Sequence, residues 1–287
     1  MDRPDAARPP REASGTAVGV AVLRAAHMLI DGEPKILDDP VSPRLFDAAM
    51  LDLIRADLRL HDPGARALRS HVVVRSRYAE DRFRDAAARG VRQFVALGAG
   101  LDTFAYRQPA WTRDAMIFEV DHPASQQHKR ERLEASGIET PPNVRYAGCD
   151  LDTVPPAQAL DAAGFDPGRP AFVSMLGVTM YLAHGAVDAV FAWCRSLAPG
   201  SELVFTYARP PAPGDEDVLA DRAAAMGEPW RTRIGHEQLE ARFRELGFPP
   251  WEFVAAPLLA ERYFVGRTDG LPAPRRASIV VVETRAP

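Results

Sequence analysis

Short apolar runs alternate with longer amphipathic or polar segments along most of the chain. An apolar run of about four to eight residues, bounded by glycine or proline, is typical of a buried strand. Such runs predict strands at 94–97, 116–120, 144–149, 170–176, 202–207 and 278–283. The segments between them predict helices at 16–29, 65–89, 124–136, 184–198 and 236–246. The alternation predicts a doubly wound α/β domain.

The first predicted helix has one apolar face. Val18, Val22, Ala25 and Leu29 lie on one stripe at helical spacing. Arg24 lies near this stripe. We interpret Arg24 as a surface residue whose aliphatic part covers apolar side chains, with a substrate contact as the alternative.

A proline-rich, acidic segment interrupts the alternation at residues 208–235. Long connections of this kind carry binding function more often than the elements they join. We therefore predict a lid over a substrate. Residues 1–15 combine charges and prolines without periodicity, so we expect them to be disordered. The remainder shows no internal repeat and no clear linker, which predicts a single domain at 16–287.

A glycine turn and a later acid point to a nucleoside. The run at 94–97 ends in Gly98, Ala99 and Gly100, where glycine permits positive φ and close approach of a ligand. Asp121 ends the next run, 21 positions beyond Gly100. In such an arrangement the turn receives the tail of the ligand, and the carboxylate accepts hydrogen bonds from the ribose hydroxyls.

Two further positions refine this interpretation. The dinucleotide fingerprint has a third glycine where this chain has Thr103, which disfavours a nicotinamide-dependent oxidoreductase but leaves it as the alternative. Asp150 and Leu151 follow the run at 144–149. An acid next to a backbone N–H suits the exocyclic amine and N1 of adenine. The alternative for Asp150 is the cap of a turn.

The sequence motifs resemble the leucine carboxyl methyltransferase family. The similar segments are VALGAGLDTFAYR, FEVDHPASQQHKRERL, the pair Asp150-Leu151 and LGVTMYL, and the likeness spans about residues 16–248. The resemblance implies a Rossmann-like seven-stranded methyltransferase sheet with a helical cap at 16–90, and S-adenosyl-L-methionine as cofactor. Members of this family include bacterial enzymes that O-methylate polyketide-type carboxylic acids.

The resemblance also implies cofactor contacts. An arginine of the family binds the carboxylate of the methionine part; Arg75 is the closest match and Arg77 the rival. A guanidinium suits this role because it binds a carboxylate bidentately and keeps its charge. The alternative is a solvated helix with charges paired at helical spacing. We also place His122 among the cofactor-binding residues, and Leu176, where many relatives have a glutamate that touches the cofactor.

Three residues are predicted to bind the acceptor. Tyr181 either lines the substrate pocket or is a core aromatic residue with a satisfied hydroxyl group. Trp230 and Arg231, with Arg233 nearby, lie in the predicted lid and suit an aromatic, anionic acceptor.

Charge and composition exclude several other functions. A formal net charge of −4 and a pI near 6.0 give no electrostatic case for nucleic acid or an anionic membrane. The two cysteines, Cys149 and Cys194, lie in apolar runs and are interpreted as small buried residues; no motif predicts a metal. Without a signal peptide or an apolar stretch of about 18 residues, we expect a cytoplasmic protein.

The expected reaction needs little from the protein beyond positioning. A carboxylate acceptor, with a pKa near 4, is already ionised and needs no general base. We assign no catalytic residue: His122, His184 and His236 are interpreted as surface or capping residues. The predicted function is O-methylation of a carboxylate, or a hydroxyl group, of a small natural-product-type acceptor. A catalytically silent cofactor-binding module is the other alternative, and a homo-oligomer stays open.

Overall fold

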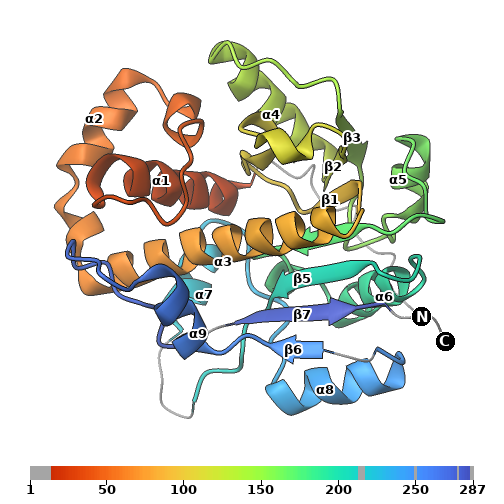
Figure 1. The fold of residues 1–287 in the computed structure, drawn as a ribbon. Helices are drawn as coiled ribbons and strands as arrows, with labels where there is room; N and C mark the ends of the chain where they lie inside the picture. Colours follow the sequence, from red (N-terminus) through yellow and green to blue (C-terminus); the bar gives the residue numbers. More distant parts are fainter. Residues whose placement is uncertain (1–13, 213–216, 249–250, 277, 285–287) are drawn as a thin grey trace, which may run out of the picture.

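A seven-stranded sheet forms the centre of the computed structural model, which describes residues 14–212, 217–248, 251–276 and 278–284 (Figure 1). The strand order is β3-β2-β1-β4-β5-β7-β6. The strands are β1 (Gln93–Leu97), β2 (Met116–Asp121), β3 (Val144–Gly148), β4 (Phe172–Met175), β5 (Glu202–Thr206), β6 (Trp251–Phe253) and β7 (Ile279–Glu283). The predicted sheet is confirmed. The prediction of disorder at 1–15 falls, except for Ser14 and Gly15, outside the described residues.

Helices flank the sheet on both faces (Figure 1). They are α1 (Gly15–Ile30), α2 (Ala48–Ala56), α3 (Pro63–Ala88), α4 (Pro123–Ala135), α5 (Ala157–Ala162), α6 (His184–Arg195), α7 (Val218–Ala225), α8 (His236–Glu245) and α9 (Ala256–Tyr263). The predicted helices match α1, α3, α4, α6 and α8 within a few residues. α2 lies in the predicted helical cap and α7 in the predicted lid, whereas the sequence prediction missed α5, α9 and the short strand β6.

Adjacent strands are parallel from β3 to β5, and β7 runs antiparallel to both of its neighbours, β5 and β6. The chain order of the strands reverses between β1 and β4. In open α/β sheets, ligands bind beyond the carboxyl ends of the strands at such a switch point. The topology therefore places a binding site beside the turn that follows β1.

Each strand contributes to two hydrophobic cores because successive side chains point to opposite faces. In β1, Val95 belongs to the core beneath α6 and α8, and Phe94 to the core beneath α3 and α9. The ring of Phe83 in α3 packs at a tilt against the ring of Phe94, with the two centroids 4.8 Å apart. These cores fix α3 across the sheet and thereby fix the carboxyl ends of β1 and β4 relative to it.

The apolar stripe of α1 packs in a third cluster, as predicted. Ala25 is fully buried there, and Val18, Val22 and Leu29 are partly buried against it. The prediction for Arg24 was wrong: only 3% of it is exposed, and its guanidinium pairs with two carboxylates. The partners lie 15 and 78 positions away, so local periodicity held no information about them.

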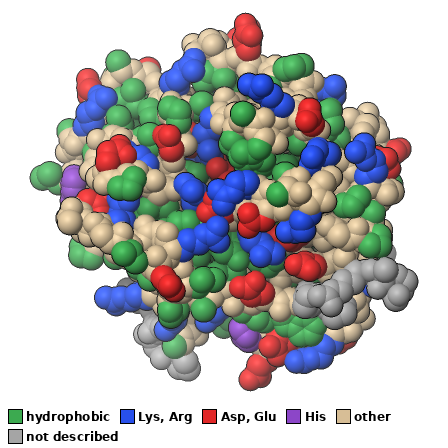
Figure 2. Space-filling view, in the orientation of Figure 1, with side chains coloured by type: hydrophobic (Ala, Val, Ile, Leu, Met, Phe, Trp, Pro, Cys, Tyr) green, Lys and Arg blue, Asp and Glu red, His purple; other side chains and the backbone are tan. Residues whose placement is uncertain are grey.

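Charges of both signs lie close together over the outer face of α3 (Figure 2). Asp81 binds Arg77 at 3.1 Å and Arg84 at 3.2 Å on this helix, and Arg262 at 3.3 Å from α9. The predicted pairing at helical spacing is thus confirmed for this part of α3. Arg75, on the same helix, faces another way.

The described residues include both cysteines and all the helices named above. Cys149 and Cys194 are both buried free thiols, as predicted. Among the residues described, no group of three or more acidic, histidine or cysteine side chains is arranged for a metal ion. None of the helices described is long and apolar enough to span a bilayer.

Candidate functional site

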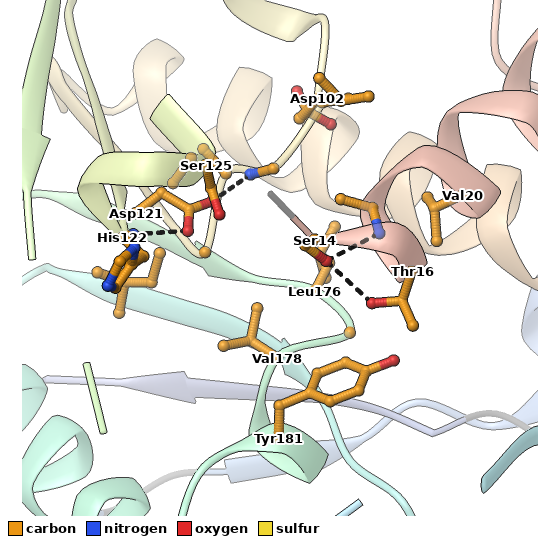
Figure 3. A pocket seen from close by; sticks show the side chains of 18 of the residues that line it. Ser14, Thr16, Val20, Asp102, Asp121, His122, Ser125, Leu176, Val178 and Tyr181 are labelled. Carbon is orange, nitrogen blue, oxygen red and sulfur yellow. Dashed lines mark hydrogen bonds between the residues drawn. The ribbon is translucent and has the colours of Figure 1, made fainter. Parts of the chain in front are cut away.

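A cavity of about 1260 Å³ lies beyond the carboxyl ends of β1, β2, β3 and β4. Its walls are the segments that follow these four strands, together with the start of α1, one side of α3 and, from the predicted lid, residues 226–229 and Arg231. Figure 3 shows the residues from α1 facing those that follow β2, with the segment after β4 between them. The cavity therefore lies at the switch point of the sheet.

Two glycines make the turn after β1. Gly98 has a φ of 65° and Gly100 a φ of 49°, in the left-handed region that disfavours side chains. A Cβ on Gly98 would lie 2.4 Å from Cγ2 of Val178. The turn after β4 is similar: a Cβ on Gly177 would lie 2.7 Å from Nη2 of Arg75. Ala99 lies between the two glycines and also lines the cavity. Glycine at both turns therefore lets Val178 and Arg75 pack directly against the backbone beside the cavity.

Asp121 lies at the end of β2, where the sequence predicts a ribose contact. Its carboxylate accepts hydrogen bonds from the N–H of Gly100, at 2.6 Å, and from the N–H of His122, at 2.7 Å (Figure 3). Burial raises the pKa of this carboxyl, and the two N–H groups lower it. The side chain thus ties the glycine turn to β2 and still lines the cavity.

His122 begins α4. Its Nδ1 accepts a hydrogen bond from the N–H of Ala124 at 3.2 Å, so the interpretation as a capping residue is confirmed. The side chain also lines the cavity beside Asp121. With its lone pair occupied by a helix cap, His122 is poorly suited to accept a proton.

The end of β3 brings Asp150 and Leu151 to the same cavity. Oδ1 of Asp150 accepts a hydrogen bond from the N–H of Asp152 at 3.1 Å, which is the turn-capping geometry that we considered. The side chain of Asp150 thus caps the turn after β3 at the edge of the cavity. Leu151 is 6% exposed and contributes an apolar wall.

The structure distinguishes the two arginines of α3. Arg77 binds Asp81 and the carbonyl of Ile36 at 3.3 Å, away from the cavity. Arg75 lines the cavity, and within the described residues its guanidinium has no hydrogen-bond or ion-pair partner. Burial, reinforced by the charge of Arg24, lowers the pKa of Arg75 to about 10. A desolvated, unpaired cation gains from an anionic ligand, which suits a carboxylate.

The candidate acceptor residues divide into two groups. Tyr181 and Arg231 line the cavity, and so does Leu176, which the sequence places among the cofactor-binding residues. Arg231 also pairs with Asp152, and 38% of its side chain is exposed.

Trp230 is not brought to the cavity lining. Its Nε1 is buried without a hydrogen-bond partner among the described residues. Arg233 stacks over its ring at 5.7 Å and pairs with Asp217 at 2.8 Å. The acceptor contacts predicted for Trp230 and Arg233 therefore gain no support from this arrangement.

Sequence reasoning missed a buried ionic network behind the glycine turn. Asp39 lies at its centre: it accepts hydrogen bonds from Arg24 at 2.9 Å and from the hydroxyl of Thr103 at 2.7 Å, and Arg107 approaches to 3.3 Å. Thr103, the position at which the dinucleotide fingerprint has glycine, thus has a structural role of its own. Arg24 joins this network to Asp102 at 2.5 Å.

Sequence reasoning also missed a contact between the start of α1 and the 226–231 segment, which together form the roof of the cavity. The hydroxyls of Ser14 and Thr16 both donate to the carboxylate of Glu228, and all three residues line the cavity. The sequence carries no signal for this contact, because the groups lie more than two hundred residues apart.

Comparison with known proteins identifies the family. The leucine carboxyl methyltransferase family matches residues 17–195. The chain belongs to this family. A Frankia alni relative, named as an S-adenosyl-L-methionine-dependent methyltransferase, is 34% identical over 253 residues, or 86% of this chain and 80% of its own. A Mycobacterium marinum relative with the same description is 36% identical over 233 residues, or 78% of this chain and 74% of its own.

Solved structures confirm the fold. A crystal structure from Thermobifida fusca superimposes with a TM-score of 0.58 at 22% identity, covering 98% of this chain and all of the other. A structure from Streptomyces avermitilis gives 0.58 at 19% identity, covering 91% and 96%.

The described residues fit the cofactor of this methyltransferase family. One cavity is surrounded by the glycine turns after β1 and β4, the guanidinium of Arg75 and the carboxylates of Asp121 and Asp150. The protein is an S-adenosyl-L-methionine-dependent methyltransferase.

Proposed function

We propose that this enzyme transfers a methyl group from S-adenosyl-L-methionine to a carboxylate oxygen of a small, natural-product-type molecule. A hydroxyl acceptor is the second option. The observation that carries the proposal is the state of the titratable groups in the cavity. The imidazole of His122 and the carboxylates of Glu80 and Glu228 already accept hydrogen bonds from the chain, so we infer that the acceptor arrives as a nucleophile.

The engaged groups are specific. Nδ1 of His122 accepts a hydrogen bond from a backbone N–H at the start of α4. The carboxylate of Glu228 accepts hydrogen bonds from two hydroxyl groups. The carboxylate of Glu80 is bound by Arg107. A phenol or alcohol needs a general base, because its pKa is near 10 or higher. A carboxylate is ionised at neutral pH and needs none. The arrangement therefore favours a carboxylic acid.

The size of the cavity leaves space for an acceptor. Drug-sized ligands occupy pockets of about 300–1,000 Å³, and this cavity of about 1260 Å³ exceeds that range. Val20, Tyr181 and Met226 line it away from the glycine turn. We infer that the acceptor lies against these side chains, with Arg231 at the rim. Trp230 and Arg233 remain sequence predictions in this role.

The chain's main contribution to the reaction is positioning. When bound, the cofactor supplies a sulfonium methyl group that is already a strong electrophile. We infer that Arg75 holds the methionine carboxylate, Asp121 the ribose hydroxyls, and Asp150 with Leu151 the adenine. Fixing the acceptor in line, in a cavity closed by the 226–231 segment, can supply roughly 7–11 kcal/mol of the barrier.

The two rival functions make different predictions. A nicotinamide-dependent oxidoreductase would bind NAD(P)H, and a silent module would bind S-adenosylhomocysteine without turnover of any acceptor. Family membership favours neither. Only Leu176, at the position where relatives have glutamate, points toward the silent module.

The test uses methyl-labelled S-adenosyl-L-methionine and matched pairs of aromatic carboxylic acids and phenols. A methyl ester releases labelled methanol in mild base, whereas a methyl ether does not. We expect base-labile product from the acids, and a rate that does not rise between about pH 7 and pH 9, since the acceptor is fully ionised. Base-stable product formed only from phenols would overturn the carboxylate assignment.

A further inference from the structure

One carboxylate in the cavity has no role in the assignments above. Asp102 lies two positions after Gly100, and it lines the cavity with 29% of its side chain exposed. Its Oδ2 accepts a hydrogen bond from Nη1 of Arg24 at 2.5 Å, and its Oδ1 accepts one from the N–H of Phe104 at 2.8 Å. A carboxylate has about four lone-pair sites. The carboxylate of Asp102 can therefore accept further hydrogen bonds from donors in the cavity.

The neighbouring acids are less available. Both oxygens of Glu80 accept hydrogen bonds from Arg107. Asp39 is 1% exposed, and arginine and threonine groups surround its carboxylate. Asp121 is held by two backbone N–H groups and is predicted to bind ribose. Asp102 is thus the acid beside the glycine turn that combines exposure to the cavity with vacant lone pairs.

Asp102 is also negatively charged when a ligand arrives. Burial raises the pKa of this carboxyl, but the positive charges of Arg24 and Arg107 more than offset that effect and hold the pKa well below its usual range. An ionised carboxylate makes its strongest hydrogen bonds to charged donors. The best ligand group for this position is therefore a cation with several N–H donors.

The cavity presents the opposite charge nearby. Arg75 has no ion-pair partner within the described residues, and its guanidinium lies against Gly177. The charge of Asp102 is among those that act on Arg75: it raises the pKa of that guanidinium, against the larger lowering by burial. Arg75, at the turn after β4, and Asp102, at the turn after β1, line one cavity and together are complementary to a zwitterion.

The methionine part of the cofactor carries such a zwitterion, an α-carboxylate and an α-ammonium group. We propose that Asp102 binds the α-ammonium group of the cofactor, whose α-carboxylate is held by Arg75 in the same cavity. This inference rests on the proposed role of Arg75. Asp102 is then a binding residue, and Arg24 and Phe104 position its carboxylate.

The test is titration calorimetry with S-adenosylhomocysteine and two analogues of it. One analogue lacks the α-ammonium group, and the other lacks the α-carboxylate. A hydrogen bond between charged groups changes affinity roughly 10- to 100-fold, so we expect wild type to lose that factor with the first analogue. In Asp102→Asn, S-adenosylhomocysteine should weaken by a similar factor, and removal of the ammonium group should have little further effect.

The second analogue separates ligand binding from a structural role. Asp102→Asn should still lose affinity when the carboxylate is removed, whereas Arg75→Met should lose its sensitivity to the carboxylate and keep its sensitivity to the ammonium group. If Asp102 only supported Arg24, the variant would weaken all three ligands equally, which would overturn the inference. Asp102→Glu, which keeps the charge, should regain part of the discrimination and serves if Asp102→Asn does not fold.

The outcomes also distinguish this inference from the proposed function. Wild type that binds S-adenosylhomocysteine and its deaminated analogue equally well would refute the role of Asp102 alone. Failure of folded wild type to bind S-adenosylhomocysteine would instead refute the cofactor assignment itself. The acceptor chemistry is tested separately, by the base lability of the methylated product.

Discussion

The hydroxyl group of Ser14 donates a hydrogen bond of 2.9 Å to the carboxylate of Glu228, 214 residues further along the chain. Thr16 donates to the same oxygen. The contact joins the start of α1 to the 226–231 segment, and both line the cavity. A few polar contacts thus close the roof of the cavity, and such contacts open more readily than a packed core does.

Glu228→Ala should loosen this roof. A hydrogen bond to a charged group contributes about 1.5–3 kcal/mol when buried, and less here because the site is partly exposed. We expect amide hydrogen exchange in α7 and in residues 226–231 to rise several-fold, with little change elsewhere. The exposed Glu139→Ala is the matched control and should exchange as wild type does. Identical exchange in wild type and Glu228→Ala would show that the contact does not hold the roof closed.

Gly98→Ala should abolish cofactor binding, and Gly137→Ala provides a matched comparison. Both glycines have a φ near 60°, so alanine costs about 1–2 kcal/mol of backbone strain at either position. Only at Gly98 would the new Cβ meet another group, Val178 at 2.4 Å; nothing lies within 4 Å of a Cβ at Gly137. Urea unfolding should show a similar loss for both from strain, with an additional loss for Gly98→Ala.

The two variants should differ most in calorimetry with S-adenosylhomocysteine. Gly137→Ala should bind as wild type does, since its turn lies outside the cavity lining. Gly98→Ala should show no measurable binding. Normal binding by Gly98→Ala would mean that the turn after β1 is not where the cofactor tail lies.

Local sequence patterns predicted the elements of this site that depend on neighbouring residues. The strand, turn and acid from β1 to Asp121 lie within one continuous segment, so their spacing fixes their geometry. β6 was missed because its three residues are too few to show alternation. Its place at the edge of the sheet comes from pairing with β7, more than twenty positions later.

Side-chain direction was harder to predict than secondary structure. Trp230 and Arg231 are adjacent in the lid, yet Arg231 lines the cavity and Trp230 packs beneath Arg233. Arg24 looked like a surface residue because its partners, Asp39 and Asp102, come from other elements. Such contacts depend on how the chain returns to the site, which spacing within one element cannot reveal.

The stability of the fold should fall at acidic pH through Asp31. Its carboxylate binds Arg69 bidentately at 2.7 and 2.8 Å and His27 at 2.8 Å. Burial raises the pKa of Asp31, but the hydrogen bonds from His27 and Arg69 together have the larger effect and bring the pKa below its usual value. The folded-state pKa thus lies below the unfolded value of about 3.9. The stabilisation is present above that pH and is lost as pH falls through the folded-state pKa.

Asp31→Asn should remove this dependence. Asp31 and Arg69 are 6% and 1% exposed, and breaking such a buried pair costs about 3–5 kcal/mol. Urea unfolding should give that loss near pH 7, and a shallower fall in stability between about pH 5 and pH 3 than in wild type. Asp114→Asn, at an exposed position, is the control and should keep the wild-type slope. A wild-type slope in Asp31→Asn would place the acid sensitivity in another group.

Asp121→Asn should weaken the cofactor through its ribose. The carboxylate already accepts one N–H at each oxygen, from Gly100 and from His122. An asparagine can accept at only one of these atoms, so the variant both disturbs the turn and loses an acceptor for the ribose hydroxyls. We expect the affinity for S-adenosylhomocysteine to fall roughly 10- to 100-fold, measured by calorimetry.

An analogue that lacks the two ribose hydroxyls separates these effects. Wild type should bind it far more weakly than S-adenosylhomocysteine, because Asp121 then faces no donor. Asp121→Asn should bind the two ligands with similar affinity. Asp150→Asn alters the predicted adenine contact at the same cavity and should keep the full penalty for the missing hydroxyls. If Asp121→Asn also keeps that penalty, the ribose contact belongs to another residue, and Asp121 serves only to hold the glycine turn against β2.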